Sequence, residues 1–86
     1  MLLSVILEYT MAVALSKSAA VLGAGIIVIG ASWGISRIGA NAMEAMARQP
    51  QAAGDIRSGM ILSAAFIEGV SLLAVLVCLL SYFVQL

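Results

Sequence analysis

The sequence has no histidine, one cysteine and one proline, and it contains only four basic and four acidic residues. A single cysteine, Cys78, excludes an internal disulfide framework and a cysteine-based metal cluster. The scattered cations and the net charge of zero exclude the basic patch that nucleic-acid binding requires. Charged residues make up 9% of the chain, against about 25% in soluble domains, which argues against a water-soluble fold and a soluble enzyme.

Hydrophobic residues, in contrast, make up 64% of the chain and gather in two long segments. Residues 18–36 carry no charge, and the only charged residue in 58–86 is Glu68. A membrane-spanning helix needs about 17–25 mostly apolar residues, and neither segment has the period of two expected of a barrel strand. The sequence therefore predicts an all-α membrane protein, an antiparallel hairpin of two transmembrane helices at 17–46 and 55–86.

A polar loop at 47–54 is expected to join the two helices. With the turn centred in this loop, Arg48 lies opposite Asp55, and the sequence predicts an ion pair between them, of the exposed kind that contributes less than about 1 kcal/mol. The same register places Ile35 of the first helix at the depth of Glu68 on the second.

Basic residues are concentrated at the loop end of the hairpin, where Arg37, Arg48 and Arg57 lie, whereas Lys17 stands alone at the other end. The positive-inside rule predicts a cytoplasmic loop with both termini outside. Residues 1–16 lack the positively charged start of a signal peptide. We interpret them as an upstream extension of the first helix or as a segment at the outer interface. The absence of a transit peptide favours a bacterial plasma membrane.

The first helix is rich in small residues, which allow helices in a membrane to approach closely. Gly30 and Gly34 form one ridge, Ser32 and Ser36 form another, and Gly23 adds a further small position. At about 100° per residue the two ridges lie on nearly opposite sides of the helix. Two such faces predict head-to-tail contacts that close into a homo-oligomeric ring. Tight packing of the first helix on the second is the alternative interpretation.

Glu68 is the most informative residue of the second helix. It lies about 15 Å beyond the polar loop by helical rise, near the middle of the bilayer. An ionised carboxylate there costs about 2.5–3.5 kcal/mol, and intramembrane acids are functional by default. Burial in hydrocarbon favours the neutral form of the carboxyl group. We therefore interpret Glu68 as a reversible proton carrier.

Three features together resemble the c subunit of F-type ATP synthase over residues 18–86: the glycine-rich first helix, the loop sequence Arg48-Gln49-Pro50, and the acid in AAFIEGVSL. The resemblance implies a non-catalytic rotor subunit whose ring turns against subunit a. It implies that Glu68 gains and loses a proton at that interface. It also implies that Arg48, Gln49 and Pro50 contact the central-stalk subunits gamma and epsilon.

The resemblance implies that the backbone carbonyl of Phe66 accepts the proton of the Glu68 carboxyl group. The other residues expected around the proton site are Ala31, Ile35, Ala65 and Leu72. Membrane lipids are expected as further neighbours. No cofactor is expected, since the transported ion is the only ligand.

The choice of ion can be argued from two positions. Sodium requires several oxygen ligands, and sodium-type members of the family have oxygen-bearing side chains where this chain has Ile35 and Gly69. H⁺ is therefore the expected ion, with a sodium-coupled rotor as an alternative. A pore-forming hairpin of the holin type and a structural membrane hairpin are the alternatives from other classes.

Overall fold

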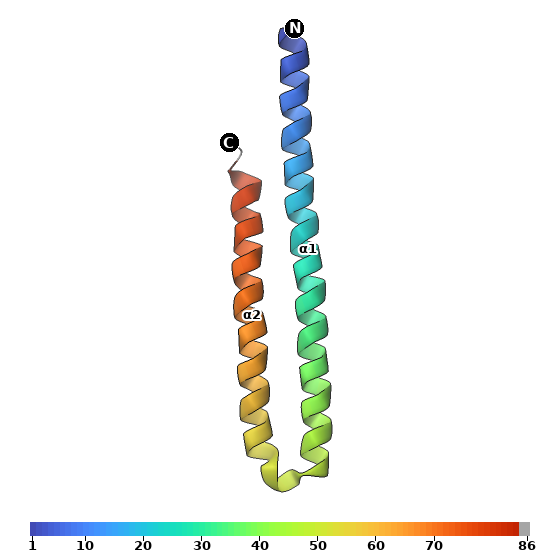
Figure 1. The fold of residues 1–86 in the computed structure, drawn as a ribbon, viewed down its shortest axis with the longest axis vertical. Helices are drawn as coiled ribbons and strands as arrows, with labels where there is room; N and C mark the ends of the chain where they lie inside the picture. The colour runs from blue at the N-terminus through green and yellow to red at the C-terminus, as the bar shows by residue number, and fades with distance from the viewer. Residues whose placement is uncertain (85–86) are drawn as a thin grey trace.

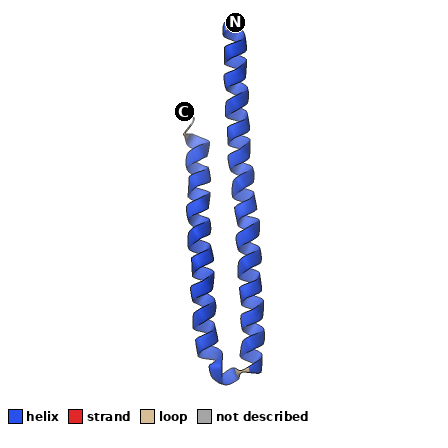
Figure 2. Ribbon diagram, in the orientation of Figure 1, coloured by secondary structure: helices blue, strands red, loops and turns tan. Residues whose placement is uncertain are grey.

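The computed structural model describes residues 1–84, which form a helical hairpin (Figure 1). Helix α1 spans Leu2–Arg48, the short 3-10 helix η1 spans Pro50–Ala52, and α2 spans Ala53–Phe83. The two long helices run antiparallel along a shape of 74 × 16 × 8 Å, and no strand occurs in the described part of the chain (Figure 2). The predicted all-α hairpin is therefore confirmed.

The turn between the helices is set by proline. Pro50 disfavours a helical conformation for the residue before it, and Gln49 accordingly leaves the helix with φ −132° and ψ 73°. The amide of Ala52 then donates to the carbonyl oxygen of Gln49 at 3.0 Å, which closes η1 directly beneath α1. Gln49 is thus the single residue between α1 and η1.

The helices extend further than the predicted segments. α1 begins at Leu2, not at Lys17, so residues 2–16 are continuous with the rest of this helix. Four residues assigned to the loop 47–54 belong to the helices instead: Ala47 and Arg48 to α1, and Ala53 and Gly54 to α2. The predicted limits were based on polar residues, which show where a chain leaves the apolar part of a membrane. A helix can continue beyond that point, so its ends lie elsewhere. The limits of the membrane-spanning parts stay predictions, and residues 85–86 of the segment 55–86 lie outside the described residues.

The contact between α1 and α2 follows a regular stripe, which we call the seam. Half-buried residues recur at steps of three and four along both helices, the spacing of helices that pack side by side at a shallow angle. On α1 the seam contains Ala20, Ala24, Ile27, Ala31, Ile35, Ile38 and Ala42, and on α2 it contains Ile56, Met60, Ala64, Ile67, Ser71, Val75 and Cys78.

The glycines of α1 divide between the seam and the open surface. A Cβ built on Gly34 would lie 3.1 Å from Ile67 Cδ1, and one on Gly23 would lie 3.6 Å from Cys78 Sγ, so both border α2. A Cβ on Gly25 or Gly30 would meet nothing within 4 Å. Part of the small-residue pattern therefore serves packing within the hairpin, as the alternative interpretation held, and part is left free.

The hairpin leaves most of its apolar surface uncovered. Ala42, at 8% exposure, is the only described hydrophobic residue that is buried. Both long helices are long and apolar enough to cross a membrane. Apolar surface on this scale requires lipid or other protein around it, which is consistent with a subunit that works in a bilayer and in an assembly.

Candidate ion-binding site

Glu68 lies in a shallow groove between the two helices. The groove has a volume of about 290 Å³, and residues from both helices line it. Apart from Glu68, the lining residues are Ile27, Val28, Ala31, Ser32 and Ile35 of α1 and Ser71, Leu72 and Val75 of α2. The register predicted from the sequence, which placed Ile35 at the level of Glu68, agrees with this arrangement.

The carboxyl group of Glu68 has no protein partner among residues 1–84. It forms no ion pair with a basic residue and no hydrogen bond, and its side chain is exposed at the surface of the single hairpin. A charged group without a partner is strongly disfavoured in an apolar environment. The groove therefore presents a carboxyl group that no basic residue of the described hairpin neutralises.

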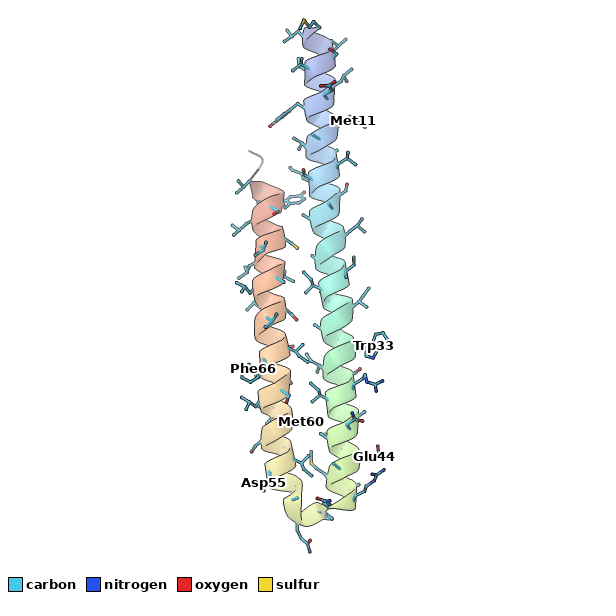
Figure 3. All side chains as sticks on the ribbon, in the orientation of Figure 1. Met11, Trp33, Glu44, Asp55, Met60 and Phe66 are labelled. Atoms are coloured by element: carbon cyan, nitrogen blue, oxygen red, sulfur yellow. The ribbon has the colours of Figure 1, made fainter. Side chains whose placement is uncertain are left out.

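The predicted surroundings of Glu68 fall into three groups. Ala31, Ile35 and Leu72 line the groove together with Glu68. Phe66 lines a neighbouring groove instead, and Figure 3 shows its ring on the side of α2 that faces away from α1. Ala65 lines neither of these two grooves.

Two hydroxyl groups in the groove were not assigned to the site from the sequence. Ser32 was interpreted as a ring-packing residue, yet it lines the Glu68 groove, and Ser71 lies one helical turn beyond the acid. The register was the signal that could have found Ser32, because it puts a residue three positions before Ile35 one turn from Glu68. Ser71 is a neighbour of Glu68 by helical spacing alone, and the sequence shows it as such. Ser36, the other member of the serine ridge, donates its hydroxyl to the carbonyl oxygen of Trp33 at 2.9 Å.

The ion pair expected across the turn is not formed. Arg48 pairs with Glu44 of its own helix, four residues earlier, and not with Asp55. Residues four apart on a helix are neighbours, whereas Arg48 and Asp55 belong to different helices separated by η1. The predicted stalk-contact residues lie together at the closed end of the hairpin. Arg48 ends α1, Gln49 connects the two helices and Pro50 begins η1.

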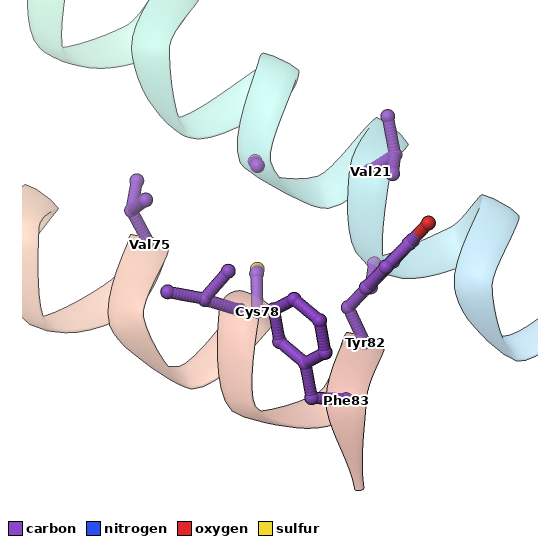
Figure 4. Close-up of a pocket in the computed structure, with 8 residues that line it drawn as sticks. Val21, Val75, Cys78, Tyr82 and Phe83 are labelled. Atoms are coloured by element: carbon purple, nitrogen blue, oxygen red, sulfur yellow. The ribbon is translucent and has the colours of Figure 1, made fainter. Parts of the chain in front are cut away.

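A second groove lies near the open end of the hairpin, and it has a volume of about 280 Å³ (Figure 4). Its walls are mostly aliphatic and aromatic, and no acidic or basic residue lines it; the labelled members are Val21, Val75, Cys78, Tyr82 and Phe83. Such a groove has no charged side chain that could pair with an ion. Within residues 1–84, no three His, Cys, Asp or Glu side chains are grouped so that they could share a metal ion.

The fold and the groove define a class of protein: a two-helix membrane subunit with one unpaired acid between its helices. The model of the ATP synthase C subunit family matches residues 18–81. The chain belongs to this family.

Named relatives agree with the family assignment. The chain is 63% identical over 84 residues to the ATP synthase c subunit of Bacteroides thetaiotaomicron, an alignment that covers 96% of this chain and 99% of the relative. It is 59% identical over 83 residues to the ATP synthase c subunit of Phocaeicola vulgatus, with coverages of 96% and 99%. It is 42% identical over 66 residues to the chloroplastic ATP synthase c subunit of Cyanidium caldarium, with coverages of 77% and 80%.

Family membership fixes the general role. The chain is a membrane subunit of an ATP synthase, and assembly into a ring is expected of the family. As one subunit of a larger complex, it contributes to ion transport and ATP synthesis without being the catalyst itself.

Proposed function

We propose that this chain is a proton-carrying rotor subunit and that Glu68 is the group that carries the proton. The observation that supports this most strongly is the position of Glu68: an acid without a partner, in a groove that is otherwise lined mostly by apolar residues. The only basic residue that pairs with an acid in the described hairpin is Arg48, and its partner is Glu44.

The proton would be exchanged at the contact with subunit a. There the carboxyl loses its proton to an aqueous path, pairs with a cation of subunit a, and takes up a proton from a second path. Between these visits the group travels in its neutral form, because the ionised form is costly in lipid. Each cycle advances the ring by one subunit, and rotation in either direction couples proton flow to ATP synthesis or hydrolysis.

The polar groups of the groove support H⁺ as the ion. Sodium is a hard cation that needs several oxygen ligands, and the side chains of this groove offer only Glu68, Ser32 and Ser71. Ile35, at the level of the acid, has no oxygen in its side chain, and neither has Gly69. A proton requires only the carboxyl group itself, so we favour H⁺ over sodium, and no cofactor is needed.

The closed end of the hairpin would pass rotation to the central stalk. Arg48, Gln49 and Pro50 stand at its tip, where subunits gamma and epsilon would contact the ring. The excess of arginine at this end favours a tip in the cytoplasm and both termini outside. Since relatives come from bacteria, the plasma membrane is the expected location.

Glu68→Gln tests the proposal, because it keeps the size of the side chain and removes the titrating group. We expect intact rings whose proton transport, measured in inverted vesicles, is abolished. The matched control is Glu44→Gln, which neutralises an acid on the outward side of α1 and should retain transport (Figure 3). Transport that persists in Glu68→Gln would overturn the assignment, as would a pore that conducts without the rest of the complex.

A further inference from the structure

α1 continues well beyond the end of α2. Residues 2–16, which we call the N-terminal segment, are helical and most of them extend beyond the end of α2, although Ser16 still lines a groove with Cys78 and Ser81 of α2 (Figure 1). Lys17 marks the level at which the hairpin opens, since its Nζ lies 4.8 Å from the ring centre of Tyr82 near the end of α2. Beyond this level most large apolar side chains are exposed, with Leu2 at 75% and Leu15 at 67%, whereas Val13 is half-buried.

The N-terminal segment needs a cover that the hairpin itself does not supply. The molecule is 74 Å long, whereas a bilayer with its headgroups measures about 40–45 Å, so a substantial part of the hairpin must project from the membrane. The segment adds roughly 22 Å by helical rise, and Glu8 is its only charged residue. An isolated helix of this composition would expose a continuous apolar surface to water.

The sides of α1 indicate what covers the segment. Relative to the seam, Gly23 and Gly30 lie on one flank of α1, and Gly25 and Ser32 lie on the other, at about 100° per residue. Because the seam faces α2, these flanks are the sides on which α1 can meet the next copies in a ring. Gly25 and Gly30 are open in the single hairpin, as this contact requires.

Both flanks continue into the N-terminal segment. Ala12 follows on the flank of Gly23 and Ala14 follows on the flank of Gly25, so each flank keeps a small residue within the segment, whereas Ser16 lines a groove with α2. Glu8 lies away from the seam, at the border between the flank of Ala12, which follows four residues later, and the third side of the helix. Figure 3 shows Met11, on this same third side, pointing away from α2.

We propose that the N-terminal segments of neighbouring copies pack against one another through these two flanks and form a helical collar that extends the ring beyond α2. The occupant is a second copy of this chain, because the flanks of the segment are continuous with those that face neighbouring copies in the ring. The family match begins at residue 18, so the collar lies outside it. The alignment with the Bacteroides relative spans 96% of this chain and so includes most of the segment.

Cysteine cross-linking in assembled rings tests the collar. With Cys78→Ala as background, the double variant Ala12→Cys with Ala14→Cys places one thiol on each flank, and oxidation in membranes should give a ladder of linked subunits. Each single variant should give no ladder, because a head-to-tail contact brings one flank against the other. The two thiols of one chain cannot pair, since positions two apart point to different sides of a helix. Intact rings that give no ladder, or a mature chain that begins after residue 16, would overturn the collar.

If the cysteine variants fail to assemble, the dissociation temperature of the rings tests whether the N-terminal segments pack against one another. Ala12→Leu and Ala14→Leu should lower the temperature at which purified rings dissociate in detergent by several degrees, whereas Met11→Leu, on the third side, should not. Equal dissociation temperatures in all these variants would mean that lipid covers the segment and would overturn the proposal. The collar requires the ring but not the proton assignment, so proton transport can be normal or absent in either outcome.

Discussion

α1 and α2 are both long apolar helices, but they carry different residues in the part of the hairpin where they run side by side. α1 has no acid between Lys17 and Arg37, and it holds a series of glycines there, Gly23, Gly25, Gly30 and Gly34. α2 has a single glycine after residue 60, and directly before it stands Glu68. Under the proposed function, the first helix is specialised for close contact and the second for carrying the proton, and each property can be tested separately.

The largest effect is expected from filling an open glycine of α1. Gly30→Leu places a bulky side chain on a flank where nothing lies within 4 Å in the single hairpin but where a neighbouring copy must approach. We expect the loss of detergent-stable rings in gel electrophoresis. Gly59→Leu, at an equally open glycine of α2, is the matched control and should leave the rings intact. Intact rings in both variants would contradict the division of roles.

Labelling of Glu68 by a hydrophobic carbodiimide tests whether this residue of α2 binds H⁺ or sodium. In the natural chain, raising the pH should protect Glu68 and sodium at neutral pH should not. The double variant Ile35→Gln with Gly69→Ser adds oxygen atoms on both helices beside the acid. We expect sodium to protect Glu68 in this variant at neutral pH, because a hard cation binds where several oxygen ligands are available. Sodium protection of the natural chain would overturn the proton assignment.

A smaller effect is expected where α1 touches α2. Gly34→Ala would place a methyl group 3.1 Å from Ile67 Cδ1, which must shift by a few tenths of an ångström. The crowding opposes the gain of roughly 1 kcal/mol that alanine brings over glycine within a helix. We expect a net change below about 1 kcal/mol in the unfolding free energy of the hairpin in detergent. Adding Ile67→Val should relieve the crowding, and a double-mutant cycle measures this coupling.

The smallest effect is expected from the ion pair at the tip. Glu44→Gln breaks the pair with Arg48, whose two side chains are largely exposed. Exposed pairs of this spacing on a helix contribute about 0.3–0.5 kcal/mol. The thermal melting curve of helicity in detergent should be nearly unchanged. A large loss of stability would show that Arg48 depends on Glu44 for more than this local pair.

The sequence was sufficient for the elements that a strong physical constraint determines. Long uncharged stretches allow only helices in a bilayer, and Pro50 located the turn, so the hairpin and the level of Glu68 with Ile35 could be predicted. The sequence could not predict which of several equally favourable partners a side chain would contact. Arg48 had acids available on both helices, and Ser32 had two possible neighbours, since only the rotation of α1 about its axis decides between the ring contact and the Glu68 groove.

The brevity of the turn has a mechanical consequence. With Gln49 as the only residue between α1 and η1, and η1 leading directly into α2, the tip contains almost no slack. A torque applied at the level of Glu68 would reach the tip through stiff helical backbone with little twist lost on the way.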